Sequence, residues 1–296
     1  MKQVKLLHNP TAGDEEHSKE ELISLIQSKG YECNYSSTKE KGWDELKDGT
    51  DFIIIAGGDG TVRKMVKKLV YRKLIDKQYP IALLPMGTAN NIAATLGFID
   101  QPENIIKSWN NNNLKRIDIG KVSGIDETFF LEGFGFGVFP RLMKEMKERD
   151  IEATTPEKEL ETALKILTEI IDSYKAKSCT LEIDGINHSG NFLMVEILNI
   201  RSIGPNLALA PMADPGDGLF EIVLIKEEQK EEFKQYIINK LNGIEESFIF
   251  SVINARNITI NWDGKFAHAD DELLCIEKEE IKIELLEGVL KFFAEP

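Results

Sequence analysis

Short apolar runs alternate with amphipathic stretches over the first third of the chain. Phe52–Ala56 is a continuous β-branched run, typical of a strand that is buried on both faces of a sheet. Glu15–Lys29 has apolar residues at helical spacing and is stopped by Gly30. Alternating strands and helices predict a parallel sheet covered by helices, an α/β domain. The other elements expected here are strands at Val4–His8, Tyr31–Ser36 and Ile81–Leu84 and helices at 63–77 and Thr88–Leu96.

The pattern changes after residue 120, where short strands become frequent and few helical stretches interrupt them. This predicts a second, mostly antiparallel β domain, a β-sandwich. We expect the first domain to cover residues 1–122, completed by the C-terminal tail 286–296, and the second to cover 123–285. The expected strands are Thr128–Leu131, Thr180–Ile183, Phe192–Asn199, Leu219–Ile225, Asn257–Asn261, Ile281–Leu285 and Leu290–Phe293, and the expected helices are Pro156–Tyr174 and Glu228–Leu241.

The net charge of −14 argues against general nucleic-acid binding, which depends on cationic side chains that neutralise phosphates. No apolar run reaches the ~18 residues of a membrane-spanning helix. The first residues lack the apolar core of a signal peptide. The three cysteines are far apart, unlike those of a disulfide framework or a zinc site. Together these features predict a cytoplasmic protein.

Residues 63–77 are an exception to the acidic balance, because their charges are almost all basic. Apolar residues at helical spacing predict an amphipathic helix with a basic outer face. One interpretation is a solvated surface helix. The other is a contact for phosphates or an anionic membrane, which would place the protein peripherally at the inner membrane surface.

The stretch Gly57-Gly58-Asp59-Gly60-Thr61 follows a buried strand and leads into a helix. Glycines allow backbone N–H groups to approach an anion closely, and a helix N-terminus favours negative charge, so this loop can hold phosphate. Asp59 would repel that phosphate unless a cation lay between them, which implies Mg²⁺. The alternative is a tight turn in which Asp59 caps the next helix.

Two further loops carry glycine together with hydroxyl and amide side chains. Asn9–Gly13 follows the first strand, and Pro85–Asn90 follows a later one. Ligands of open α/β sheets bind at the carboxyl ends of the strands, and all three loops are expected there. We therefore predict that they converge on one site.

At these residues the chain resembles the diacylglycerol kinase catalytic-domain family, which includes bacterial lipid kinases and sphingosine-kinase relatives. The resemblance runs over nearly the whole chain. Its G-G-D-G-T motif alone is shared with NAD kinases and phosphofructokinases, so an NAD kinase remains an alternative. The matching segments are Asn9–Gly13 (N-P-x-[SA]-G), Gly57–Thr61 (G-G-D-G-T), Pro85–Asn90 (P-x-G-T-x-N), Asp118 at the domain junction, and Asp217–Glu221 (D-G-x-[LF]-[DE]).

The resemblance implies an NAD kinase-like domain that binds ATP and a β-rich domain that binds the lipid substrate. It implies transfer of the γ-phosphate of ATP to the hydroxyl of a lipid such as diacylglycerol, with Mg²⁺. The implied nucleotide-binding residues are Asn9, Pro10, Thr11, Ala12, Gly13, Thr38, Gly57, Gly58, Asp59, Gly60, Thr61, Val62, Arg63, Gly87, Thr88 and Asn90. The implied metal ligands are Asp217 and the carbonyls of Asp214 and Leu219, with Asp118 linked through water.

The resemblance also implies two catalytic residues, Asp59, which organises metal and phosphate, and a Glu base in a D-G-E turn before the last strands. Asp263-Gly264-Lys265 looks closer by letter, but a charged lysine cannot accept a proton. Asp270-Asp271-Glu272 has the expected distance from the closing strands. We therefore assign Glu272 as the base, with Asp271 in place of the usual Gly, because Asp tolerates a left-handed turn. The alternative is an acidic surface turn.

The chain departs from the usual family pattern near the cleft. Asn91 and Gly137 stand where the family often has Asp, Arg63-Lys64 stands in place of the usual Asn-Glu, and Asp271 in place of Gly. A catalytically weak nucleotide- or lipid-binding protein is therefore a third hypothesis. None of the four histidines has metal-binding spacing, and we expect them to serve packing or solvent-facing roles. The acceptor lipid and the formation of a homodimer are left open.

Overall fold

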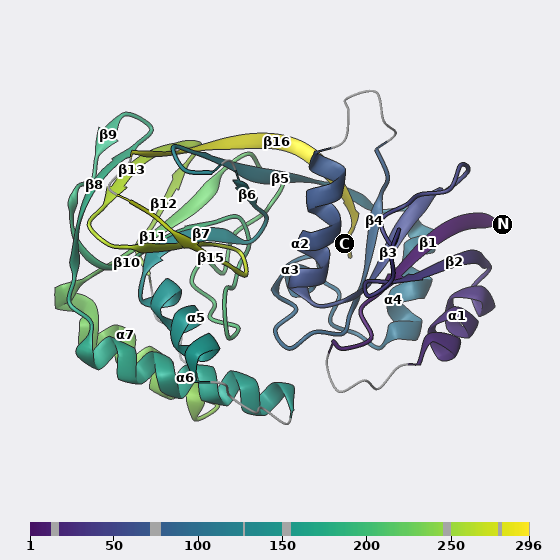
Figure 1. The fold of residues 1–296 in the computed structure, drawn as a ribbon, viewed down its shortest axis with the longest axis horizontal. Helices are drawn as coiled ribbons and strands as arrows, with labels where there is room; N and C mark the ends of the chain where they lie inside the picture. The colour runs from purple at the N-terminus through teal and green to yellow at the C-terminus, as the bar shows by residue number, and fades with distance from the viewer. Residues whose placement is uncertain are drawn as a thin grey trace. The chain divides into compact units, whose positions relative to one another are not determined.

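The computed structural model describes residues 1–12, 18–71, 78–126, 128–149, 155–244, 250–277 and 280–295. The chain divides into two compact units, one made of Met1–Ile117 with Gly288–Pro296 and one made of Asp118–Glu287. Two strands, β5 (Leu114–Ser123) and β16 (Ile281–Phe293), run from one unit into the other (Figure 1).

The first unit is built on a parallel sheet in the order β2-β1-β3-β4, followed by the end of β16. β3 is buried along its whole length, as its β-branched sequence predicts. The strands are β1 (Lys2–His8), β2 (Tyr31–Ser37), β3 (Phe52–Gly57) and β4 (Ile81–Pro85). The helices are α1 (Lys19–Ser28), α2 (Asp59–Val70), α3 (Asn91–Thr95) and α4 (Pro102–Ser108), with a 3₁₀ turn at Trp109–Asn111.

An aromatic cluster joins distant parts of this unit. Phe52 of β3 packs edge-on against Tyr31, Trp109 and Phe293, with ring centroids 5.1–6.0 Å apart. Such edge-to-face pairs add about 0.5–1.5 kcal/mol each to the burial of the rings. Phe293 thereby ties the C-terminal tail to the first unit.

The basic helix expected at 63–77 differs from the observed one. α2 begins earlier, at Asp59, and ends at Val70, while 72–77 lie outside the described residues. Met65 and Val66 of the predicted apolar stripe are buried, but Arg63 is buried too instead of lying on the outer face. Lys64 and Lys68 lie over the ring of Trp43, and Lys68 also pairs with Asp44 at 3.1 Å.

The second unit is a mostly antiparallel β domain with helices along one side (Figure 1). Its main strand order is β15-β14-β7-β10-β8-β13-β16, with β11 on the other edge of β10. The strands are β6 (Thr128–Phe130), β7 (Gly133–Gly137), β8 (Lys177–Ile183), β9 (Ile186–Asn187), β10 (Gly190–Leu198), β11 (Phe220–Lys226), β12 (Val252–Ala255), β13 (Asn257–Trp262), β14 (Phe266–Ala269) and β15 (Glu272–Cys275). The helices are α5 (Val138–Glu148), α6 (Pro156–Ser173) and α7 (Lys230–Leu241), with a 3₁₀ turn at Glu227–Gln229.

Two apolar cores stabilise this unit. One lies among the strands and contains Phe134 and Phe136 of β7. The other lies between α5, α6 and α7 and the opposite side of β10 and β11, and it contains Phe139. The phenylalanine-rich stretch from Phe129 to Phe139 is therefore core. The predicted fold class, an α/β domain followed by an antiparallel β-sandwich, is confirmed.

Two local expectations were wrong. The closing segment is one strand, β16, because the chain passes through Gly288 at φ +61° without leaving the sheet. The expected helix Thr88–Leu96 is shorter, α3, and Asn90 precedes it in the left-handed conformation at φ 53°. Helices α4 and α5 were not predicted from the sequence.

Gly137 has a backbone reason to be glycine. It has φ +98°, and a Cβ there would lie 2.0 Å from the backbone oxygen of Leu193 on β10. Its departure from the family's Asp is thus tied to the close packing of β7 against β10, and no side chain fits without a shift of the backbone.

We expect Gly137→Ala to lower the free energy of unfolding by about 2–5 kcal/mol, since it combines left-handed strain with steric overlap. Gly185→Ala is the matched control, because Gly185 has φ +81° but nothing within 4 Å of a Cβ. Gly185→Ala should lower the free energy of unfolding only by the backbone strain, about 1–2 kcal/mol. Urea unfolding measures both, and equal losses would contradict the packing argument.

Candidate functional site

The predicted loops of the first unit meet at the carboxyl edge of its sheet. The amide of Asn9 donates to the oxygen of Ala56 (2.9 Å), and its side-chain Nδ2 donates to Thr61 Oγ1 (3.3 Å). Thr38, at the end of β2, donates its hydroxyl to Asn9 Oδ1 (3.3 Å). Three segments far apart in sequence are therefore brought together around one asparagine.

Gly87 of the Pro85–Asn90 loop packs against Gly58 of the Gly57–Thr61 loop. A Cβ on Gly87 would lie 2.3 Å from Gly58 Cα, and a Cβ on Gly58 would lie 2.9 Å from Gly87 Cα. The two glycine loops therefore touch backbone to backbone. This contact is a second reason for these glycines, besides the approach to phosphate that the sequence suggested.

Asp59 joins the same two loops. Its carboxylate accepts from the amides of Asn91 (2.8 Å) and Ile92 (3.1 Å) at the start of α3. The alternative in which Asp59 caps a helix is thus partly correct, although the capped helix is α3. The start of α2 has no side-chain cap. First-turn amides without such a cap are suited to an anion.

The remaining predicted nucleotide residues occupy varied environments. Thr11 is exposed and donates its hydroxyl to Asn9 Oδ1 (3.1 Å), whereas the side chains of Val62 and Arg63 are buried. Asn90 folds back so that its Oδ1 accepts from Gly87 N (2.8 Å). Gly13 lies outside the described residues. Pro10, Ala12, Gly60 and Thr88 are half-buried in the loops that meet at this edge.

The predicted metal ligands lie in one tight loop of the second unit. Asp118 is buried, and its Oδ2 accepts from Gly218 N (2.8 Å) while its own amide donates to Pro215 O (2.7 Å). Asp217 Oδ1 accepts from Leu219 N (2.9 Å). Asp118 therefore holds this loop through two hydrogen bonds, and its link to a metal through water stays a prediction.

The last residue of the same motif, Glu221, is a buried carboxyl that the sequence analysis did not assign to the site. Its Oε2 has no hydrogen-bond partner among the described residues. Burial, together with the negative charges of Asp217 and Asp214, raises the pKa of Glu221 to about 7. The burial of Glu221 could have been predicted from the D-G-x-F-E motif, because its Glu directly follows Phe220, the first residue of the buried strand β11.

Glu221 should make stability depend on pH in the metal-free protein. Because the pKa of Glu221 is higher in the folded than in the unfolded chain, the unfolded chain ionises first as the pH rises. The free energy of unfolding therefore falls as the pH rises toward neutrality. Glu221→Gln lacks this loss, so its stability relative to wild type should grow by ~2 kcal/mol between about pH 5.5 and about pH 8. Chemical unfolding with chelator present measures the difference, and a constant difference would contradict the assignment.

Glu272 begins β15, opposite Ala269 of β14, and its side chain is exposed. Asp270 and Asp271 form the turn between these strands. The left-handed residue is Asp270, at φ 52°, and not Asp271 as expected. Asp270 is also buried, and its carboxylate accepts from the amides of Leu131, Glu132 and Gly133 at 2.8–3.2 Å. The turn is therefore only partly the acidic surface turn of the alternative interpretation.

His268 was expected to have a packing or solvent role and instead forms a buried polar pair. Its Nε2 lies 3.0 Å from Glu196 Oε2, and the side chains are 2% and 0% exposed. The sequence could not predict this pair, because His268 and Glu196 lie some seventy positions apart and only strand pairing brings them together.

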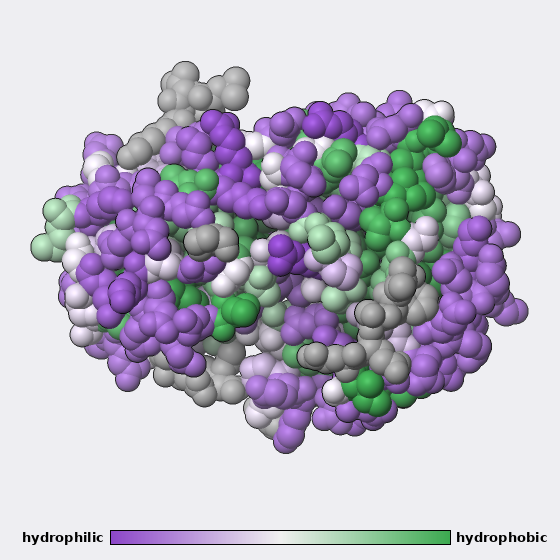
Figure 2. All heavy atoms as spheres, turned by 180° about the vertical axis from the view of Figure 1, so that it is seen from behind, coloured by the Kyte–Doolittle hydropathy of each residue, from purple (hydrophilic) through white to green (hydrophobic). Residues whose placement is uncertain are grey.

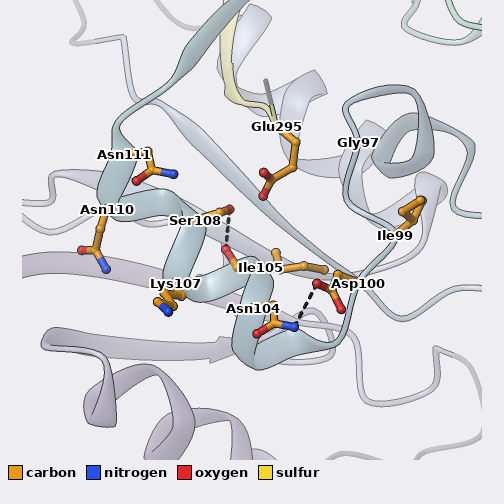
Figure 3. A pocket seen from close by; sticks show the side chains of 10 residues that line it. All are labelled: Gly97, Ile99, Asp100, Asn104, Ile105, Lys107, Ser108, Asn110, Asn111 and Glu295. Carbon is orange, nitrogen blue, oxygen red and sulfur yellow. Dashed lines mark hydrogen bonds between the residues drawn. The ribbon is translucent and has the colours of Figure 1, made fainter.

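A hollow of about 860 Å³ lies on the first unit and is shown in Figure 3. It is formed by the loop before α4, by α4 and the following 3₁₀ turn, and by Glu295 of the tail. In Figure 3, Asn104 points toward Asp100, which its Nδ2 contacts at 2.9 Å. None of the predicted site residues lines it, so the described hollow is separate from the motif loops.

Two family models match the chain. The diacylglycerol kinase catalytic domain matches residues 3–122, and the YegS C-terminal NAD kinase beta sandwich-like domain matches residues 146–291. A diacylglycerol kinase of Bacillus subtilis is 26% identical over 290 residues, which cover 90% of each chain. A protein of Salmonella arizonae described as "Probable lipid kinase YegS" is 27% identical, over 92% of this chain and 89% of the relative.

Solved structures show the same fold. A diacylglycerol kinase from Bacillus anthracis has a TM-score of 0.74 at 22% identity and covers 100% of this chain and 98% of its own. An NAD kinase from Archaeoglobus fulgidus, solved with ATP, has a TM-score of 0.54 at 15% identity, over 99% of this chain and 93% of its own. The two matched domains together span most of the sequence, and this chain belongs to the diacylglycerol kinase catalytic-domain family of lipid kinases.

Proposed function

We propose that the protein transfers the γ-phosphate of ATP to the hydroxyl of a lipid such as diacylglycerol, with Mg²⁺ as cofactor. The observation that carries the proposal is the convergence of Asn9, Thr38 and Thr61 beside the open start of α2. Family membership supports the reaction class, and this geometry supports binding of a polyphosphate by the first unit.

ATP would be held mainly by the loops of the first unit. ATP could accept from the hydroxyls of Thr11 and Thr38 once they turn away from Asn9 Oδ1, to which both donate in the structure, and from backbone amides in the first turn of α2. Asp59 would keep the two glycine loops together through its bonds to α3. The nucleotide-binding role of residues 1–122 and the lipid-binding role of 123–285 are parts of this proposal.

The 214–221 segment fits a hard divalent cation. Its donors are oxygen atoms, and the buried Glu221 Oε2 without a partner lies in a cluster of negative charge that a cation would offset. Among the described residues, no ready group of three or more His, Cys, Asp or Glu side chains is formed. We propose Asp217 with the carbonyls of Asp214 and Leu219 as the ligands of a structural Mg²⁺.

Glu272 is the proposed general base. The lipid oxygen would form a bond to the γ-phosphorus while the bond from that phosphorus to the β–γ bridging oxygen breaks and ADP leaves. The hydroxyl proton would pass to the Glu272 carboxylate. Its exposed position at the start of β15 leaves it accessible to an acceptor.

Membrane contact is proposed through the exposed lysines of α2, Lys64, Lys67 and Lys68. No helix in the described part of the chain is long and apolar enough to span a bilayer. On the face shown in Figure 2, hydrophobic areas lie between broad hydrophilic ones. Binding to anionic vesicles that weakens with salt would support this contact at the inner membrane surface.

The decisive experiment follows label from [γ-³²P]ATP into mixed-micelle lipids and, in parallel, into NAD, with and without Mg²⁺. Labelled lipid only in the presence of Mg²⁺ is the expected result. Labelled NAD would instead make the protein an NAD kinase, which the fold likeness to the Archaeoglobus fulgidus enzyme keeps as the second candidate. ATP binding with no labelled product would favour the catalytically weak binding protein.

A further inference from the structure

Three neighbouring strands of the second unit place a glycine between two buried ionisable residues. Gly135 of β7 is directly opposite Glu196 of β10 on one side and His268 of β14 on the other. Residues two strands apart are normally separated by the side chain between them. Here the middle residue has none, and a Cβ on Gly135 would lie 2.2 Å from the Glu196 carboxylate. The glycine thus lets His268 reach Glu196.

The alternation of β7 shows which face of the sheet carries this pair. Phe134 and Phe136 point into the core among the strands, so Gly135 lies on the opposite face. That face is covered by α5, whose Phe139 ring stands edge-on to the His268 ring with centroids 6.4 Å apart. The pair is therefore sealed from water by a helix.

The second ring nitrogen of His268 contacts the Asp270–Asp271 turn. Nδ1 lies 3.0 Å from the backbone oxygen of Asp270, which can only accept, so Nδ1 carries a proton. Asp270 is fixed further by its carboxylate bonds to residues 131–133 and by its amide, which donates to Gly133 O (2.9 Å). Glu272 follows two residues later, at the start of β15.

We propose that the Glu196–His268 pair, made possible by Gly135, is a positioning element that holds the Asp270–Asp271 turn and thereby sets the place of the base Glu272. This inference rests on the proposed function for its catalytic consequence. His268 and Glu196 act through the turn and do not touch the substrate. Misplacing a reacting group by about 1 Å can cost roughly 100-fold in rate, so support of the turn matters for kcat.

Electrostatics agrees with a tight pair. Burial raises the pKa of Glu196, and the charge of His268 opposes that rise. Burial lowers the pKa of His268, but Glu196 and the Asp270 contacts raise it by more. One proton lies between Nε2 and the carboxylate whether the pair is ionic or neutral, so the hydrogen bond persists in both states.

Two substitutions separate the contacts of the pair. Glu196→Gln is isosteric and can donate to a neutral His268 Nε2, so it keeps both links. His268→Gln can reach Glu196 but loses the donor to Asp270 O. His188→Gln, a change of the half-buried His188 in the turn between β9 and β10, is the matched control. Gly135→Ala displaces the pair without changing either member.

The full chain is tested by hydrogen–deuterium exchange of the 266–275 segment and by kinetics with ATP and diacylglycerol micelles. We expect His268→Gln and Gly135→Ala to speed exchange in this segment and to lower kcat roughly 10- to 100-fold, with KM for ATP unchanged. Glu196→Gln and His188→Gln should stay within about 3-fold of wild type in both readouts.

Wild-type exchange and wild-type kcat in His268→Gln would overturn the proposal. So would a loss of kcat in Glu196→Gln as large as that in His268→Gln, because Glu196→Gln keeps the bond. If wild-type protein phosphorylates no lipid, the proposed function fails, and the exchange readout alone decides whether the pair holds the turn.

Discussion

Glu272→Gln should lower kcat for phosphoryl transfer to lipid by roughly 10²–10⁴-fold, the range expected for loss of a general base. The amide is isosteric with the carboxylate but cannot accept a proton. Because Glu272 is exposed at the start of β15, stability and ATP binding should stay at wild-type values. The measurement is steady-state transfer from labelled ATP into lipid, with ATP affinity from calorimetry.

Two neighbouring carboxylates provide controls for this prediction. Glu277→Gln changes an exposed carboxylate just beyond β15 and should leave kcat unchanged. Asp263→Asn tests the other candidate turn, Asp263-Gly264-Lys265. Full activity in Glu272→Gln would remove it as the base, and a large loss in Asp263→Asn alone would move that role to the second turn.

The sequence predicted the first unit well because its signals are local. The β-branched run of β3 and the helical spacing that ends before Gly30 each act within a few residues, and the structure has both β3 and α1. The meeting of Asn9, Thr38 and Thr61 was also predictable, since parallel strands present their carboxyl ends at one edge. The partner of Asp59 was missed, because the choice of α3 over α2 depends on how closely Gly58 and Gly87 approach.

The second unit was predicted less completely, and the failures are non-local. Gly137 could be interpreted only as a missing carboxylate until its contact with Leu193 O on another strand was known. The pair of His268 and Glu196 depends on the register of three strands, which no single segment specifies. Buried polar networks of this kind are fixed by tertiary packing, so local propensity carries no trace of them.

The second large effect is expected at Asp59. Asp59→Ala removes two hydrogen bonds to the first amides of α3 and should cost about 1–2 kcal/mol of stability, as the loss of a helix cap does. It also releases the Gly57–Thr61 loop from the Pro85–Asn90 loop, which disorders the proposed polyphosphate site. We therefore expect a loss of transfer of roughly 10²–10³-fold, in the range seen when an electrostatic contact in an active site is removed.

Asp100→Ala is the control that separates the loss of a helix cap from the loss of the proposed polyphosphate site in Asp59→Ala. Asp100 accepts from Gln101 N (2.6 Å) and from Asn104 Nδ2 (2.9 Å) at the start of α4, so it has a comparable local role outside the motif loops. Both variants should lose similar stability in urea unfolding, but only Asp59→Ala should lose ATP binding and transfer. Asp59→Asn should be intermediate, because its remaining oxygen can accept one of the two bonds. If Asp59→Ala bound ATP and transferred phosphate like wild type, Asp59 would be a helix cap alone and the polyphosphate would have to be held elsewhere.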